Sequence, residues 1–136
     1  MTRLRAASAA VAVAGLGIAA YLTAVHYAAA APACAIAHGC EIVQRSGYAE
    51  LAGVPVAVLG LAGYAAILMS LAGDGERART VTAFLALAGL GFSGWLTYVE
   101  LAVLEAVCSW CVGSALCMAA LAALSVARLL GALSMR

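Results

Sequence analysis

The chain has 136 residues, of which 67% are apolar and 10% are charged, and its formal net charge is +1. A water-soluble domain of this size has a large surface for its volume and needs many more charged residues to cover it. The composition therefore excludes an ordinary soluble domain, and the small net charge gives no support for binding nucleic acid. It predicts a protein whose solvent is mostly lipid.

Four windows without a charged residue divide the chain, and each is long enough to cross a bilayer as a helix. Backbone polar groups in hydrocarbon must bond within their own segment, and these windows lack the alternating pattern of a membrane strand. We therefore predict an all-α membrane protein, a bundle of four transmembrane helices. The expected spans are approximately residues 6–31, 54–73, 80–103 and 109–131.

The first span could instead be a cleaved signal peptide, because a basic start and an apolar stretch precede small residues and Cys34. The apolar stretch is about twice as long as the core of a signal peptide. Its outer third also carries Tyr21 and Tyr27, which suit a position at the membrane interface. We expect this segment to remain as a span.

The arginines orient the predicted bundle. With an even number of spans, six of the seven arginines fall on one side, and only Arg45 falls on the other. The positive-inside rule then places both termini on the cytoplasmic side. We expect the membrane to be the inner, or cytoplasmic, membrane of the cell. The six are Arg3, Arg5, Arg77, Arg79, Arg128 and Arg136.

The same orientation assigns the loops. The loop of about 32–55 and the turn of about 105–110 face outward, and the inner loop covers 73–79. We expect residues 41–51 of the first loop to be partly helical and to lie on the membrane surface. Glycines at positions 60, 63, 89, 91 and 94 should allow neighbouring helices to approach closely.

Four of the five cysteines fall on the outer side, where thiols tend to be oxidised. Cys108 and Cys111 form a CxxC motif at the start of the fourth span. A disulfide between them would close a very small ring and constrain the unfolded chain little, whereas a redox dithiol needs adjacent partners. A helix N-terminus also favours the thiolate, the species that performs thiol–disulfide exchange. We therefore predict that this pair is redox-active.

The other cysteines have two interpretations each. Cys34 and Cys40 could form a loop disulfide, or a mobile pair that carries electrons between a soluble partner and the CxxC pair. Cys117 lies within the fourth span and is expected to be a small buried apolar residue. A zinc site fits poorly, because the first pair has C-x5-C spacing and the compartment is oxidising. Haem attachment requires His after the CxxC motif, where this chain has Val112.

Several short sequence segments, taken together in their order along the chain, resemble the vitamin K epoxide reductase family in its bacterial form. The first is Cys34-x5-Cys40, which is followed by EIVQRSGYA at 41–49 and GVPVAVLG at 53–60. WLTY at 95–98 then precedes CSWC at 108–111. The resemblance covers nearly the whole chain.

The resemblance implies a quinone-dependent thiol oxidoreductase that supports disulfide-bond formation. Electrons would enter from a secreted thioredoxin-like dithiol protein, pass through the loop pair to the CxxC pair, and reach a membrane menaquinone or ubiquinone. Cys34 would meet the partner, Cys40 would attack or bridge to Cys108, and Cys111 would reduce the quinone. Many bacterial relatives carry a fused thioredoxin-like domain. We expect residues 1–136 to form one domain with a separate partner.

The sequence departs from the animal members of the family at two positions associated with the quinone. They have a Tyr four residues after the CxxC motif and an Asn near the end of the loop. Here the first position is Ala115, and the chain contains no Asn. The resemblance therefore supports quinone reduction better than epoxide reduction. Hydrogen-bond donors to a quinone in a dry pocket could come from Ser46, Tyr98, Ser114 or the first amides of the fourth span.

Other polar residues near the outer end are expected to have ordinary structural roles. Tyr98 could equally be an aromatic anchor at the membrane interface. Glu100 and Glu105 are expected to be solvated. His26 and His38 are expected to be ordinary interfacial or loop residues, with a proton relay to the reduced quinone as the alternative.

Two other classes of protein remain as alternatives to the enzyme. One is a non-enzymatic membrane scaffold whose disulfides are only structural. The other is a transporter or channel, which is disfavoured because the second to fourth predicted spans have no charged residue at mid-depth. A bundle with its own internal site needs no second copy, so we expect a monomer.

Overall fold

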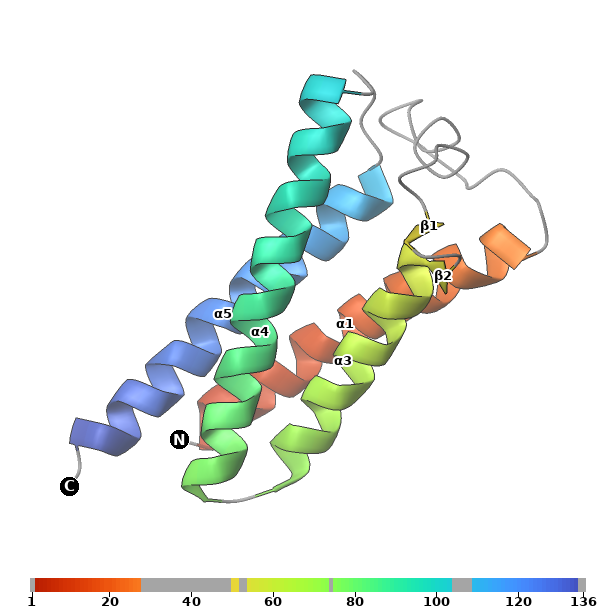
Figure 1. Cartoon of the computed structure of the whole chain (residues 1–136). Helices are drawn as coiled ribbons and strands as arrows, with labels where there is room; N and C mark the ends of the chain where they lie inside the picture. Colours follow the sequence, from red (N-terminus) through yellow and green to blue (C-terminus); the bar gives the residue numbers. More distant parts are fainter. Residues whose placement is uncertain (1, 28–49, 52–53, 74, 104–108, 135–136) are drawn as a thin grey trace.

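The computed structural model describes residues 2–27, 50–51, 54–73, 75–103 and 109–134. Within these ranges the chain is almost entirely helical (Figure 1). The helices are α1 (Thr2–Tyr27), α3 (Val56–Ala72), α4 (Glu76–Tyr98) and α5 (Ser109–Ser134). A π-helical turn, η2 (Val99–Val103), extends α4, and two short strands are β1 (Glu50–Leu51) and β2 (Val54–Pro55).

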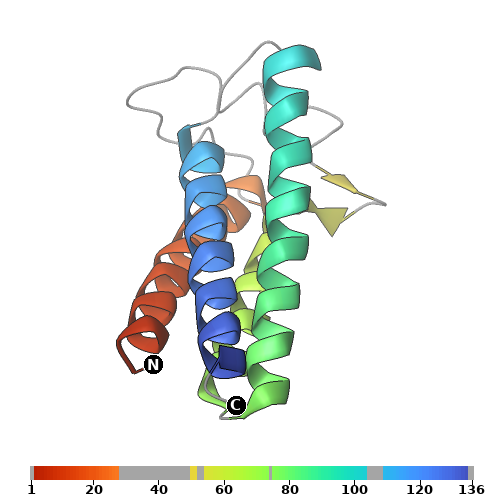
Figure 2. The same ribbon diagram turned by 90° about the vertical axis from the view of Figure 1, so that its left-hand side faces the viewer.

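The helices form a bundle in which successive helices run in opposite directions. The start of α1, the turn between α3 and α4, and the end of α5 all lie at one end of the bundle (Figures 1 and 2). Helix α1 packs against α3 and α5, and α4 packs against the same two helices. The predicted four-helix bundle is therefore confirmed in the described part of the chain.

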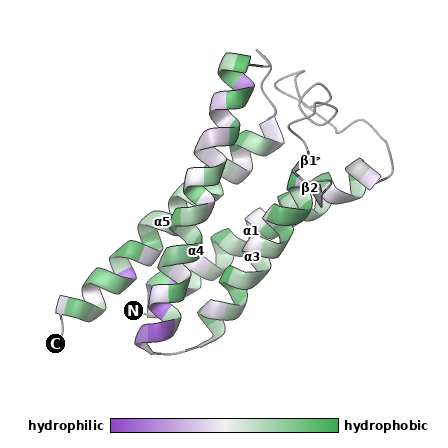
Figure 3. Ribbon diagram, in the orientation of Figure 1, coloured by the Kyte–Doolittle hydropathy of each residue, from purple (hydrophilic) through white to green (hydrophobic). Residues whose placement is uncertain are grey.

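Three of these helices are long and apolar enough to cross a membrane: Arg3–Val25, Glu76–Val103 and Ser109–Ser134. Helix α3 is apolar but has only 17 residues. Large apolar side chains on the outer faces are exposed, among them Met69, Phe84 and Leu116. Figure 3 shows this apolar character along the helices, with a strongly hydrophilic stretch at the start of α4. Lipid is the solvent that suits such faces, and the chain is a multi-pass membrane protein.

Helix α3 begins at Val56, close to the start of the predicted second span. Strands β1 and β2 pair antiparallel, with Glu50 opposite Pro55 and Leu51 opposite Val54. The chain is therefore extended up to Pro55, whose φ of −58° and ψ of 136° put it just outside the helix. Residues 50–51, at the end of the segment expected to be partly helical, are strand, and residues 41–49 of that segment lie outside the described ranges.

The predicted inner loop of residues 73–79 was too long. Helix α4 begins at Glu76, so Arg77 and Arg79 belong to its first turn. The boundary was missed because a charge-free window marks the lipid-embedded part of a helix, whereas charged residues continue the helix into water. Gly75 permits the tight turn, since its φ of 112° is a conformation that other residues rarely adopt.

Polar contacts join the helices at the end that carries the termini. The Arg5 guanidinium donates through Nε to the Leu71 carbonyl oxygen at 2.8 Å and through Nη2 to that of Ala72 at 3.1 Å. A cation thus satisfies the carbonyl groups at the C-terminus of α3, where the helix dipole favours positive charge. The Ser70 and Thr82 hydroxyls, 2.6 Å apart, join α3 to α4.

Not all of the arginines used for orientation lie in water. Arg128, near the end of α5, is only 6% exposed and lies inside the bundle. The remaining described arginines, at positions 3, 5, 77 and 79, are partly or fully exposed near the end that holds the termini. The long hydrocarbon stem of an arginine can lie against apolar surface, which explains how Arg128 is accommodated near a helix end.

Of the five glycines predicted to lie at close contacts between helices, only one does so. A Cβ added at Gly89 would lie 2.7 Å from Sδ of Met118. An added Cβ at position 60 would make ordinary contact with Ala19, and at 63, 91 or 94 it would meet no heavy atom within 4 Å. The tightest approach lies instead at Gly15, where the ring of Tyr64 occupies the space that a Cβ would need.

We predict that Gly15→Ala destabilises the bundle. The new methyl group would overlap the Tyr64 ring, and overpacking of this kind costs about 1–3 kcal/mol. Gly17→Ala, in the same helix, is the matched control because its Cβ would have open space. In detergent, the thermal unfolding midpoint of Gly15→Ala should be lower than that of the wild type, and the midpoint of Gly17→Ala should not be lowered. Equal midpoints would show that Tyr64 does not pack tightly against α1.

Candidate functional site

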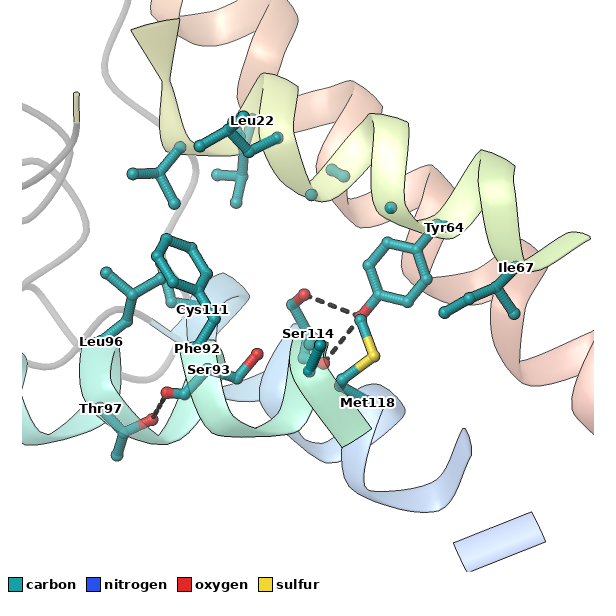
Figure 4. Close-up of a pocket in the computed structure, with 18 of the residues that line it drawn as sticks. Leu22, Tyr64, Ile67, Phe92, Ser93, Leu96, Thr97, Cys111, Ser114 and Met118 are labelled. Carbon is teal, nitrogen blue, oxygen red and sulfur yellow. Dashed lines mark hydrogen bonds between the residues drawn. The ribbon is translucent and has the colours of Figure 1, made fainter. Parts of the chain in front are cut away.

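A cavity of about 340 Å³ lies between the helices, in the half of the bundle where α5 begins (Figure 4). Its volume is within the range of small-molecule sites in proteins. The wall is mostly apolar, and many of its residues are small. The small ones are Ala19, Ala57, Gly60, Gly63, Ala88 and Gly89. The larger apolar ones include Leu22, Val56, Leu59, Ile67, Leu85, Phe92, Leu96, Val99 and Met118.

The cavity exists because residues without large side chains recur on one face of α3. Ala57, Gly60 and Gly63 are spaced three apart, which places them together on a helix surface. No heavy atom lies within 4 Å of the Cβ position at Gly63. An added Cβ at Gly60 would make ordinary contact with Ala19, so these small residues leave open space mainly beside Gly63.

The first turns of α5 bring two polar side chains to the cavity. Cys111 and Ser114 are three residues apart and both line it (Figure 4). The ring of Trp110, also in the first turn of α5, contacts the ring of Tyr21 in α1, and the two ring centroids are 4.7 Å apart. This aromatic contact joins the start of α5 to α1 and adjoins Cys111, the next residue along the chain.

Tyr64 of α3 reaches across the bundle to Ser114. The Tyr64 hydroxyl donates to the Ser114 carbonyl oxygen at 2.8 Å, and its oxygen lies 2.9 Å from Ser114 Oγ (Figure 4). Its side chain is only 1% exposed. A buried tyrosine usually finds a partner for its hydroxyl, and here the partner ties α3 to α5 one turn beyond Cys111.

Helix α4 and its π-helical turn supply the remaining polar groups of the described wall, which are Ser93, Thr97 and Glu100. Thr97 donates its hydroxyl to the Ser93 carbonyl oxygen at 2.8 Å. Glu100 was expected to be solvated, and this prediction was wrong, because the residue is only 4% exposed. The spacing of 93, 97 and 100 places Glu100 on the face of α4 that lines the cavity rather than on the outer face.

The structure therefore brings together some of the predicted site residues and not others. Cys111 and Ser114 share the cavity wall, whereas Tyr98 is 62% exposed and does not line the cavity. Cys117 packs against the hydrophobic core but is only partly buried, whereas it was expected to be buried. The other predicted residues lie outside the described part of the chain: Cys34, Cys40, Ser46, Cys108, His38, Glu105 and the side chain of His26.

Sequence reasoning missed Tyr64 and Glu100. A tyrosine in an apolar window carries no sign of its partner, because Ser114 lies 50 residues further along the chain. Glu100 lies close to Glu105, so it was assigned to the water beyond the span. Its spacing from Ser93 and Thr97 is the signal that could have placed it on the same helix face.

The sequence model described as the vitamin K epoxide reductase family matches residues 6–126. No curated protein matches the chain.

The hydrogen bond between Tyr64 and Ser114 should contribute measurably to stability. We predict a coupling energy of about 0.6 kcal/mol, and at most about 1.7, in a double-mutant cycle of Tyr64→Phe with Ser114→Ala. The cycle isolates the contact between the two side chains, because the bond to the Ser114 carbonyl oxygen is lost only with Tyr64. Tyr98→Phe, at an exposed tyrosine, is the control and should leave the free energy of unfolding unchanged. A coupling energy of zero would contradict the contact.

Proposed function

The chain belongs to the vitamin K epoxide reductase family, and on this premise we propose that it is a quinone-dependent thiol oxidoreductase of the membrane. Membership covers residues 6–126 and implies an oxidoreductase. The observation that carries the more specific proposal is Cys111 on the wall of an apolar cavity. A redox-active cysteine on the wall of an apolar cavity can transfer electrons to an apolar acceptor that binds there.

The cavity suits the ring of a quinone in three respects. Its volume is sufficient for a small ring system, its wall is mostly apolar, and its few polar groups share that wall with Cys111. Small residues on α3 leave room for a flat ring against the helix backbone. When bound, a quinone supplies an acceptor for two electrons and two protons.

Cys111 is positioned to act on that acceptor. Helix α5 begins at Ser109, so Cys111 lies in its first turn, where unpaired backbone amides favour a thiolate. The CxxC motif gives it Cys108 as a partner close in sequence. Loss of two electrons converts this dithiol into a disulfide, which a second dithiol can then reduce by exchange.

Ser114 supplies the hydrogen bond that a quinone oxygen requires in an apolar site. Tyr64 already donates its proton to the Ser114 carbonyl oxygen, so the Ser114 hydroxyl can turn from the Tyr64 oxygen towards a ligand. No donor is left unsatisfied by that change. Tyr98 faces away from the cavity and is not part of this proposal, and Ser46 remains a proposed contact on the basis of family resemblance.

The source of electrons follows from family resemblance. A secreted thioredoxin-like protein would reduce the disulfide of Cys34 and Cys40, and this pair would reduce that of Cys108 and Cys111. The acceptor would be menaquinone or ubiquinone. One chain supplies all of the described residues that line the cavity, so a monomer would suffice.

The orientation supports an active site on the outer face of the inner membrane. Arg3, Arg5, Arg77 and Arg79 lie near the end opposite the start of α5, which is the end that the positive-inside rule assigns to the cytoplasm (Figure 1). Cys111 then lies near the outer face, where a secreted dithiol protein could reach the cysteines.

Substituting Cys111 tests the enzyme against a scaffold with structural disulfides. With reduced thioredoxin as the dithiol and a short-chain quinone as the acceptor, we predict that Cys111→Ala lowers quinone reduction in liposomes to the uncatalysed rate. Cys117→Ala is the matched control, since it removes a thiol from the same helix but outside the cavity, and should retain the activity. Quinone-dependent oxidation that persists in Cys111→Ala would contradict the proposed function.

A further inference from the structure

We propose that Glu100 carries protons from the CxxC dithiol to the quinone. This inference rests on the proposed function and adds a residue that performs a different step of the same reaction. It accounts for a buried carboxyl group that electron transfer itself does not use.

The position of Glu100 is the first observation. Its side chain is 4% exposed, and it lines the cavity that Cys111 also lines. It belongs to Glu76–Val103, a segment long and apolar enough to cross the membrane. An ionisable residue within such a segment is costly to bury, and in membrane proteins it commonly marks a path for protons or ions.

The backbone at Glu100 is the second observation. Helix α4 changes at Val99 into the π-helical turn η2. Val99 and Glu100 are both buried, whereas Leu101 and Val103 in the same turn are exposed. A π-helical turn is energetically less favourable than a continued α-helix and often occurs at functional sites. Here it accompanies the change from buried to exposed side chains and leaves the carboxyl group on the cavity side.

The choice of Glu100 follows from the polar groups of the described cavity wall. Three of its residues carry titratable side chains: Tyr64, Glu100 and Cys111. The Tyr64 proton is engaged with the Ser114 carbonyl oxygen, and Cys111 is the electron donor. Glu100 supplies the carboxyl group of the described wall, and a carboxylate can accept a proton and release it again.

The proposed transfer balances in atoms and electrons. The dithiol of Cys108 and Cys111 loses two electrons and two protons, two S–H bonds break, and one S–S bond forms. The quinone gains two electrons and two protons and becomes the quinol. The Glu100 carboxylate accepts a proton released by the dithiol and donates it to a quinone oxygen. It is thereby regenerated and transfers the second proton in the same way.

The test compares Glu100→Gln with Glu76→Gln, which removes an exposed carboxyl group from the other end of the same segment. A positioned proton carrier contributes about 100-fold or more to a rate, so we expect Glu100→Gln to lower the kcat for quinone reduction about 100-fold. The Kd for a short-chain quinone should stay near that of the wild type. Glu76→Gln should match the wild type in both quantities.

Infrared difference spectroscopy supplies a readout that does not depend on turnover. Time-resolved spectra after electrochemical reduction of added quinone should show a transient carboxyl signal in the wild type and in Glu76→Gln, as the carboxyl group gains and loses its proton. The signal should be absent in Glu100→Gln. Glu100→Asp, which keeps a carboxyl group on a shorter stem, should recover part of the kcat and the signal.

The outcomes separate this inference from the proposed function. If the wild type reduces quinone and Glu100→Gln does so at the same rate, the inference is wrong while the proposed function stands. If Glu100→Gln mainly weakens quinone binding, or lowers the unfolding midpoint with no change in the infrared signal, Glu100 has a structural role and the inference is again wrong. A wild type that does not reduce quinone would overturn both.

Discussion

The contact made by Tyr64 is the interaction on which the rest of the site depends. Its ring fills the space beside Gly15 of α1, and its hydroxyl bonds to Ser114 of α5. One side chain of α3 thus holds two other helices in register at the middle of the bundle. Because Cys111 lies one turn from Ser114, the same contact fixes the cysteine relative to the cavity. The glycine at position 15 is what makes this approach sterically allowed.

Lipid as the solvent explains why the cavity can exist. In water a bundle this small would need its largest apolar side chains inside, whereas here several of them face outward and the interior contains many small residues. The interior can then enclose a space lined by Ala and Gly. The few polar groups inside have distinct proposed roles: Cys111 transfers electrons, Ser114 binds the acceptor, and Glu100 moves protons. Each lies on the half of the bundle where α5 begins.

Much of the fold could be predicted from the sequence, because membrane spans depend on local composition. The number of helices and their alternating direction follow from charge-free windows. The ends of the helices do not, since Arg77 and Arg79 continue α4 into water and the pairing of Glu50 with Pro55 delays α3. Hydropathy responds to the side chains within a window and carries no information on strand pairing or on helix turns beyond the lipid.

The site was predictable where its chemistry is local. Spacing and family resemblance identified Cys111, and its neighbour Ser114 followed from its position on the same helix. Tyr64 and Glu100 depend on which faces of α3 and α4 meet α5, which hydropathy does not determine in helices that are apolar on all sides. For the same reason Tyr98 was an equally good candidate until its outward orientation was known.

The central claim is that the cavity beside Cys111 holds the quinone, and equilibrium binding tests it most directly. Gly63 and Gly91 both have open space around an added Cβ, but only Gly63 lines the cavity. Binding of a short-chain quinone is measured by the quenching of tryptophan fluorescence. The account predicts that Gly63→Leu weakens this binding about tenfold or more, because the new side chain occupies the site. Gly91→Leu should bind like the wild type. Equal affinity in all three proteins would contradict the account.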